Sequence, residues 1–364
     1  MRYLDERVWV ILNELRPLID RQHIDITKWQ IKKKLFMRPC EADKDETPWE
    51  NFDIAKDRWY GKDTYYWFRS QFTVPQSMDG KCIFLKIHTQ IEEWDDGRNP
   101  QFLLFINGKV TQGQDMNHRE VRLTDCAKAG ETYTLDLQAY TGILHNEFSL
   151  MVTASETDLA LLKLYYDLKA PADAYHYNRM MQGRTKSLIV EALNGALNLL
   201  DLRTPHSPEF DASVAAAQEY INEHLYKNPE LSGHNEIIAS SIGHTHIDVA
   251  WWWTVSQTRE KTARSFSTVL KLMEEYPNYK FMSSQPQLYV FLKERYPEVY
   301  EKVKERVKEG RWIPEGGMWL EADCNLTSGE SLVRQFLYGK QFFKEEFGID
   351  SKILWLPDVF GYSG

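Results

Sequence analysis

Three side chains that could bind a metal ion, His244, His246 and Asp248, occupy alternate positions in the segment GHTHIDVAWWW. On an extended strand, alternate side chains point to the same face, so the three would lie close together. Imidazole and carboxylate groups are suitable ligands for Zn²⁺ or a similar divalent ion. The same pattern also fits the polar end of a strand whose histidines are hydrogen-bonded, so this segment alone leaves both interpretations open.

The segment ends in three consecutive tryptophans, Trp251, Trp252 and Trp253. Tryptophan is most often a core residue, but three consecutive side chains cannot all face one core. We therefore expect at least one indole at the mouth of the site, where its face could stack on the apolar face of a sugar ring. Core packing and sugar binding are both compatible with this pattern.

An alternation of strands and helices is predicted for the last third of the chain. Continuous apolar runs predict buried strands, and apolar residues at three- and four-residue spacing predict helices between them. The expected strands are 236–244, 279–285, 310–319 and 351–361, and the expected helices lie near 257–275, 286–308 and 328–346. Such alternation with short connections predicts a parallel α/β sheet or part of a (β/α) barrel.

Polar side chains follow each of these strands. Binding sites of parallel α/β domains lie at the carboxyl ends of the strands, where the loops converge. The polar residues at these ends are His244, His246, Asp248, Ser283, Ser284, Gln285, Glu315, Glu321, Asp323 and Asp358. A metal site built from His246, Asp248 and Asp358 would have one neutral and two anionic ligands.

The first two thirds of the chain carry different patterns. Period-two alternation, bounded by Pro, Gly, Asn and Asp, predicts six short strands in an antiparallel β-sandwich. The dipeptide Asn107-Gly108 between two apolar runs predicts a two-residue hairpin. The expected α+β multidomain chain has four parts: an N-terminal helix and connecting segment (1–63), a β-sandwich accessory domain (64–155), a helical linker region (156–235) and the parallel α/β part (236–364).

Charge and composition argue against several partners and compartments. The formal net charge of −9 leaves no basic surplus to neutralise phosphates, so no nucleic acid is expected as a partner. No apolar run approaches the ~20 residues of a membrane-spanning helix, and no signal peptide is visible. Four isolated cysteines without a C-x-x-C pair favour a reducing compartment, so we expect the cytoplasm. The oligomeric state stays open, a homo-oligomer included.

Three long motifs carry a resemblance to a known family. GHTHIDVAWWW, EGGMWLEADCNLTSGESLVRQ and WLPDVFGYSG occur in this order within residues 236–364. They resemble the successive signature segments of the glycoside hydrolase family 38 α-mannosidases, and the cytosolic and bacterial type is the most similar subgroup. The sandwich and helices before them resemble the N-terminal accessory region of that subgroup, in fold only.

The resemblance implies a site and a reaction. It implies that His246, Asp248 and Asp358 bind zinc, that Asp358 is also the catalytic nucleophile, and that Trp251 lines the sugar site. His244 is not a ligand in the family, and we expect it to orient the loop or to hydrogen-bond a ligand. The implied reaction is retaining hydrolysis of terminal α-linked mannose from oligosaccharides.

The sequence departs from the family pattern in one respect. The family's fourth zinc ligand is a downstream histidine and its acid/base is a downstream aspartate, but no histidine follows His246 in this chain. The resemblance therefore implies the N-terminal part of a longer enzyme, with only part of the site. On this interpretation the 364-residue chain is expected to be inactive by itself and to bind metal weakly.

Two other functions fit parts of the sequence. A metal-dependent amide or phosphate hydrolase can also begin with H-x-H on its first strand, but further histidines are then expected on later strands. A non-catalytic carbohydrate-binding protein could use the sandwich as its binding module. Sandwich domains in multidomain enzymes more often brace the catalytic domain, so we expect residues 1–235 to be mainly structural. A mannose titration of that region would separate these two roles.

Overall fold

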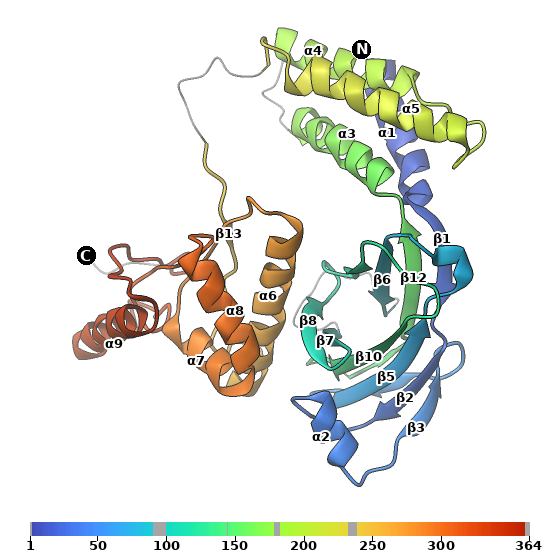
Figure 1. Cartoon of the computed structure of the whole chain (residues 1–364). Helices are drawn as coiled ribbons and strands as arrows, with labels where there is room; N and C mark the ends of the chain where they lie inside the picture. The colour runs from blue at the N-terminus through green and yellow to red at the C-terminus, as the bar shows by residue number, and fades with distance from the viewer. Residues whose placement is uncertain (1, 90–99, 144, 178–182, 232–238, 361–364) are drawn as a thin grey trace.

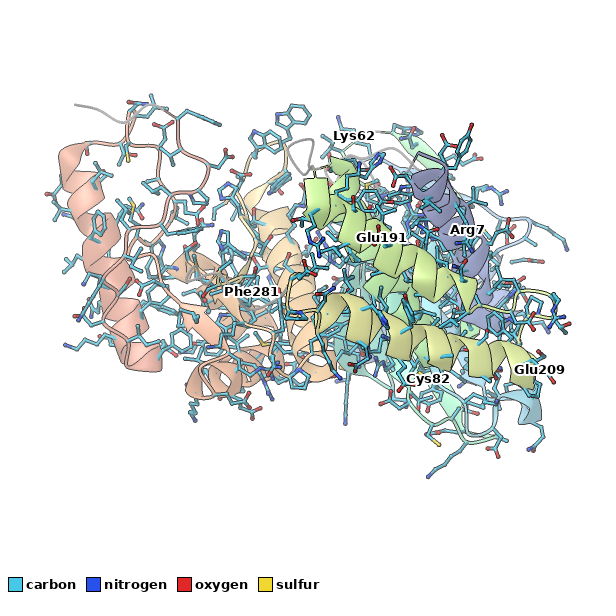
Figure 2. The ribbon with its side chains drawn as sticks, turned by 90° about the horizontal axis from the view of Figure 1, so that it is seen from above. Arg7, Lys62, Cys82, Glu191, Glu209 and Phe281 are labelled. Atoms are coloured by element: carbon cyan, nitrogen blue, oxygen red, sulfur yellow. The ribbon has the colours of Figure 1, made fainter. Side chains whose placement is uncertain are left out.

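The computed structural model describes residues 2–89, 100–143, 145–177, 183–231 and 239–360. These residues form a mixed α/β structure of antiparallel sheets, helices and a small parallel sheet. Figure 1 shows three parts: a helical bundle near the N-terminus, a β-sandwich, and an α/β part that ends at the C-terminus. Viewed from above in Figure 2, Arg7, Glu191 and Glu209 lie on the bundle, while Phe281 lies in the α/β part.

Two antiparallel sheets form the sandwich. In spatial order, the larger sheet contains β3 (Glu50–Asp53), β2 (Lys28–Lys32), β5 (Tyr65–Thr73), β10 (Thr132–Tyr140), β7 (Gln101–Ile106) and β8 (Lys109–Gln114). The smaller contains β1 (Asp20–Asp25), β12 (Met151–Thr157), β6 (Ile83–His88) and β9 (Glu120–Thr124). Side chains such as Phe68, Leu104 and Val152 fill the core between them. The antiparallel strands predicted within residues 64–155 are therefore confirmed.

The N-terminal segment contains more strand than the sequence predicted. We expected a helix and a connection over residues 1–63. Instead, β1 is part of the smaller sheet, and β2 and β3 are part of the larger sheet. A further strand, β4 (Trp59–Gly61), pairs with β11 (Asn146–Phe148). This expectation was wrong because these strands are short and partly charged, so they lack a clear alternation. Trp29, Ile31 and Phe52 nevertheless bury their side chains in the sandwich core.

The predicted hairpin connects the two strands that lie at one edge of the larger sheet. Asn107 and Gly108 have φ values of 50° and 78°, and Ile106 pairs with Lys109 across the turn. Two successive residues with positive φ match the twist of the flanking strands. The hairpin prediction is therefore confirmed, and it places β8 at the edge of this sheet.

Four helices form a bundle with its own core. They are α1 (Arg2–Leu15), α3 (Leu159–Tyr177), α4 (Gly183–Asn198) and α5 (Pro208–Ile221), and a short π-helical segment, Asn222–Tyr226, continues α5. Buried side chains from all four, such as Leu12, Leu164 and Leu193, pack together. The paired strands β1 and β12 connect the bundle to the sandwich, as Figure 1 shows. Among the described residues, no helix combines the length and apolar character needed to cross a bilayer.

The described residues of the α/β part, 239–360, contain three short parallel strands and four helices. The strands are β13 (Gly243–His244), β14 (Phe281–Ser283) and β15 (Trp312–Pro314), and the helices are α6 (Val255–Glu275), α7 (Pro286–Arg295), α8 (Pro297–Lys308) and α9 (Gly329–Phe347). The helix expected near 286–308 is divided at Tyr296, because Pro297 cannot donate the backbone hydrogen bond that would continue it.

Two expected strands are much shorter than predicted. Within the described residues 239–244, only Gly243 and His244 pair as a strand, and 239–242 are exposed. In place of the strand expected at 351–361, the described part has one parallel bridge, between Gly316 and Leu354. The side chain of Leu354 is half exposed, so it is not buried as the side chain of a core strand would be.

Helix α6 packs directly on the larger sheet of the sandwich. Trp67, Leu103 and Phe105 share one buried core with Ala263 and Phe266 of α6. Polar contacts cross the same interface. Gln257 Nε2 donates to Asp63 Oδ1 at 2.8 Å, and the Arg264 guanidinium donates to Gln101 Oε1. The sandwich therefore determines where α6 lies.

Removing residues 1–235 is expected to make the α/β part insoluble or self-associating. The deletion would expose the apolar face of α6 together with Glu260 and Arg264, which are 1% and 8% exposed in the intact chain. Soluble yield and size-exclusion chromatography of a chain starting at residue 236 measure this effect. A monodisperse, folded product would contradict the expectation.

Candidate metal centre

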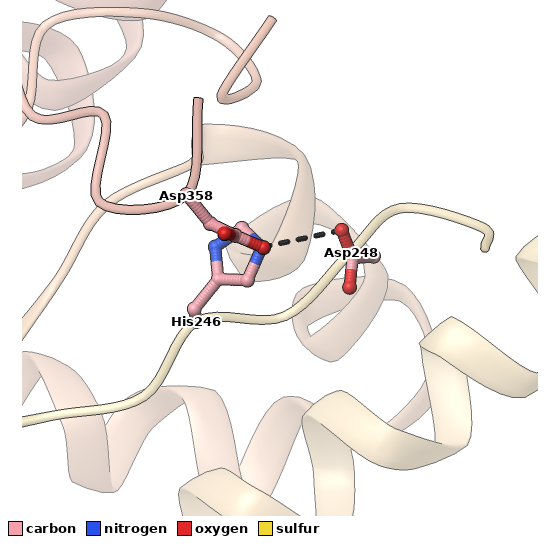
Figure 3. Close-up of side chains that lie close together, drawn as sticks. All are labelled: His246, Asp248 and Asp358. Carbon is pink, nitrogen blue, oxygen red and sulfur yellow. Dashed lines mark hydrogen bonds and ion pairs between the residues drawn. The ribbon is translucent and has the colours of Figure 1, made fainter. Parts of the chain in front are cut away.

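His246, Asp248 and Asp358 lie together although they are up to 112 positions apart in the sequence. One ligand atom from each lies within 4.8 Å of the others. Figure 3 shows the three side chains close together. His246 Nε2 is 3.2 Å from Asp248 Oδ1 and 3.7 Å from Asp358 Oδ2. The same imidazole nitrogen therefore faces both carboxylates.

The donor set and its exposure fit a bound zinc ion. One imidazole nitrogen and two carboxylate oxygens are typical zinc ligands, and an open side is typical of a catalytic zinc site. The side chains of His246, Asp248 and Asp358 are 25%, 34% and 53% exposed, so a small molecule can reach the cluster. These three residues could hold the ion and leave room for a substrate.

Glu321 contacts the other nitrogen of the His246 ring. Its Oε2 is hydrogen-bonded to His246 Nδ1, and its side chain is only 3% exposed. This hydrogen bond raises the pKa of His246 to about 9, against the opposing effect of burial, and the charge of Asp248 adds to the increase. An imidazole must be neutral to bind a metal ion, so binding at neutral pH displaces a proton from His246.

The first turn of α6 holds the segment that carries Asp248. Thr258 Oγ1 accepts from Ala250 N at 3.1 Å and lies 3.2 Å from the Asp248 carbonyl oxygen, to which it can donate. The Trp253 indole N–H also points at that carbonyl, at 3.3 Å. Thr254 and Gln257 form a capping box at the start of α6. Asp248 is therefore fixed relative to the helix.

Glu315 and Trp355 position the segment that leads to Asp358. Glu315 Oε1 accepts from the Ser351 hydroxyl and, at 3.3 Å, from Ile353 N. Trp355 Nε1 donates to His244 Nε2 at 3.1 Å. These contacts connect the Asp358 segment to β15 and β13.

His244 is not part of the three-residue cluster. Its Nδ1 lies 3.0 Å from the Met282 carbonyl oxygen, and its Nε2 accepts from Trp355. Both ring nitrogens are used in hydrogen bonds between neighbouring segments. This geometry agrees with the expected role in orienting the loop.

Trp251, Trp252 and Trp253 line a cavity of about 620 Å³ together with His246. Trp251 and Trp252 are 62% and 54% exposed and stack on each other, with ring centroids 4.8 Å apart. Trp253 is partly buried and its indole ring lies against the Lys261 ammonium. The structure exposes two of the three indoles, and the sugar-binding role of Trp251 stays a prediction.

The sandwich also contributes to this cavity, which the sequence analysis missed. Asp115 and Asn117, which follow β8, line it together with His246 and Trp251. No local pattern in the sequence could have indicated this, because the contact depends on how α6 packs on β8. The role of Glu321 was also missed, although its position after the third parallel strand was noted.

Comparisons with known proteins find a family and several relatives that this chain resembles. Residues 236–364 match the family described as "Glycosyl hydrolases family 38 N-terminal domain". "Alpha-mannosidase G" of Dictyostelium discoideum is 33% identical over 321 residues, covering 82% of this chain and 28% of that protein. "Alpha-mannosidase 2C1" of Homo sapiens is 32% identical over 319 residues, covering 82% of this chain and 29% of that protein.

A third relative matches a shorter region with higher sequence identity. "Alpha-mannosidase" of Saccharomyces cerevisiae is 38% identical over 179 residues, covering 47% of this chain and 16% of that protein. The chain thus spans less than a third of the length of these curated relatives.

Proposed function

Residues 236–364 belong to glycosyl hydrolase family 38, and on that premise we propose that the chain is part of a zinc-dependent α-mannosidase. The observation that supports this most directly is the convergence of one ligand atom each from His246, Asp248 and Asp358 within 4.8 Å of one another. The proposed substrates are oligosaccharides with a terminal α-linked mannose, in line with the names of the relatives.

His246, Asp248 and Asp358 would hold the zinc ion. When bound, zinc would act as a template and an electrostatic anchor for sugar hydroxyls. Trp251 lines the same cavity as His246 with its indole largely exposed, which suits stacking on the apolar face of a sugar ring. Together these residues would orient a mannose unit over Asp358.

Asp358 is the proposed nucleophile of a retaining reaction. In such a reaction, one carboxylate attacks the anomeric carbon, while a second carboxyl group protonates the leaving oxygen. The side chain of Asp358 is 53% exposed, so its oxygen can reach a bound sugar. A covalent glycosyl–Asp358 ester would form first, and water would then hydrolyse it with net retention of configuration.

Three further expectations belong to the same proposal. The three parallel strands with their helices are proposed to be part of a (β/α) barrel-like catalytic domain. The isolated cysteines are all free thiols in the structure, which supports a reducing compartment such as the cytoplasm. Residues 1–235 are proposed to position α6 rather than to perform chemistry.

The metal content of the protein and its His246→Ala variant tests the proposed site. In the full-length enzyme that contains these residues we expect about one zinc ion per chain, with most of it lost in the variant, because His246 Nε2 faces both carboxylates. The matched control is His23→Ala, which removes an exposed histidine of β1 in the sandwich. Equal zinc content in His246→Ala and the unmodified protein would overturn the site.

The reaction itself is tested with aryl α- and β-mannosides in the enzyme that carries these residues. We expect cleavage of the α anomer only, loss of activity with a chelator, and recovery on adding Zn²⁺. Proton NMR of the first product formed measures the configuration at the anomeric carbon. Release of the β anomer of mannose, or activity that survives complete zinc removal, would contradict the mechanism.

A further inference from the structure

We propose that Glu321 is a positioning residue for the metal site: it fixes the ring orientation and tautomer of His246, so that Nε2 faces Asp248 and Asp358. This inference rests on the proposed function, because it assumes that His246 binds a metal ion. It assigns a role to a carboxylate that the proposed reaction does not otherwise use.

The contacts of the His246 ring support this role. Nδ1 is hydrogen-bonded to Glu321 Oε2, while Nε2 lies 3.2 Å from Asp248 Oδ1 and 3.7 Å from Asp358 Oδ2. A carboxylate can only accept a hydrogen bond, so Nδ1 must carry the hydrogen. In the neutral ring the lone pair is then on Nε2, on the side of the two aspartates.

Glu321 does not line the open side of the cluster. Its side chain is 3% exposed, and its second oxygen accepts from the Ser284 hydroxyl. Both carboxylate oxygens are therefore occupied by protein groups. This excludes direct contact between Glu321 and a substrate in this arrangement, in contrast to the exposed Asp323 two residues later.

Gln285 connects the Glu321 loop with the ligand segment. Gln285 Oε1 accepts from Glu321 N at 3.4 Å, and its Nε2 donates to the Ile247 carbonyl oxygen at 2.9 Å. Ile247 lies between the two ligands His246 and Asp248 in the sequence. Gln285 is 3% exposed and has a left-handed backbone with φ of 60°.

The loops after all three parallel strands thus meet behind the ligand. His246 follows β13, Ser284 and Gln285 follow β14, and Glu321 follows β15. A buried carboxylate on the far nitrogen of a ligand histidine orients the ring and increases its basicity, and losing it typically costs about 10- to 100-fold in metal affinity. Glu321 is such a carboxylate, because its buried side chain is hydrogen-bonded to His246 Nδ1.

Cobalt titration of the 364-residue chain tests this role independently of turnover. Co²⁺ affinity and the visible absorption bands of the bound ion are measured for the unmodified chain, Glu321→Ala, Glu321→Gln and Asp323→Asn. We expect Glu321→Ala to weaken binding by about 10- to 100-fold and to change the visible bands. Glu321→Gln should bind more tightly than Glu321→Ala, because an amide oxygen can still accept from Nδ1.

Asp323→Asn is the matched control for charge. Asp323 is in the same loop, and its carboxylate accepts from Asn325 N in a local turn that asparagine can also form. We expect unchanged affinity and bands in this variant. If Asp323→Asn and Glu321→Gln weakened binding equally, the effect would be one of loop charge and the positioning role would be overturned.

A second variant covers the case in which Glu321→Ala does not fold. Ser284→Ala leaves Glu321 in place but removes the hydroxyl that holds it, and should weaken Co²⁺ binding in the same direction by a smaller factor. If Glu321→Ala folds, unchanged Co²⁺ affinity and unchanged visible bands in that variant would overturn the inference. If it does not fold, unchanged affinity and bands in both Ser284→Ala and Glu321→Gln would overturn it. No Co²⁺ or Zn²⁺ binding by the unmodified chain would instead overturn the proposed metal site on which it rests.

Discussion

Replacing Asp358 by asparagine is expected to reduce α-mannoside turnover by on the order of 10⁴-fold, the scale seen when one member of a nucleophilic site is removed. An amide has no anionic oxygen to attack the anomeric carbon, so the covalent ester cannot form. The measurement is kcat with an activated aryl α-mannoside, made in the enzyme that carries these residues.

The interpretation requires a check of metal content, because Asp358 also faces His246 Nε2 at 3.7 Å. Zinc should therefore be quantified in the variant, and activity compared at saturating zinc. Asp350→Asn is the matched control, since that carboxylate forms an exposed ion pair with Lys340, and such surface pairs contribute little. A trapped sugar found by mass spectrometry on a carboxylate other than Asp358 would show that the assignment is wrong.

Gly339→Ala is expected to destabilise the α/β part by about 3 kcal/mol, at the upper end of the usual range for overpacking. Gly339 lies in α9, where an added Cβ would be 2.3 Å from the Gly317 carbonyl oxygen and 2.6 Å from the Met318 carbonyl carbon. Both atoms are backbone, so they cannot move aside as a flexible side chain would. Thermal and urea unfolding measure the loss.

The same substitution should also weaken metal binding. The clashing backbone immediately precedes Glu321, and α9 holds it through the Gln335 carbonyl oxygen, which accepts from Trp319 N at 2.9 Å. Gly329→Ala is the control within the same helix, because its added Cβ would have no atom within 4 Å. That variant should be neutral or more stable by up to about 1 kcal/mol. Equal stability of the two variants would contradict the packing described.

The sequence indicated the convergence of the three predicted ligands well. His246, Asp248 and Asp358 were expected at one edge because the carboxyl ends of parallel strands meet there, and the structure brings them together. The alternating strands of residues 65–156 were equally clear, since one face of each strand is buried in the sandwich. In both cases the pattern along the chain reflects a regular geometry.

Other features depend on contacts between distant segments and left no local pattern. The strands within residues 20–61 are short and partly charged, and they exist because the sheets supply partners for them. The strand expected at 351–361 is reduced to the bridge at Leu354, although its apolar sequence favours a strand. Asp115 reaches the cavity beside His246 only because α6 packs on β8.

The hydrogen bonds of Thr258 have a consequence for how distant parts of the molecule influence one another. Thr258 ties the backbone of Asp248 to α6, and α6 shares a buried core with Leu103 and Phe105 of the sandwich. Metal binding and the docking of α6 are therefore linked equilibria, and thermodynamic linkage is reciprocal. An ion that binds only the docked state stabilises docking. Substitutions that loosen the sandwich from α6 should then lower metal affinity in proportion to the docked population that they remove, without touching a single ligand.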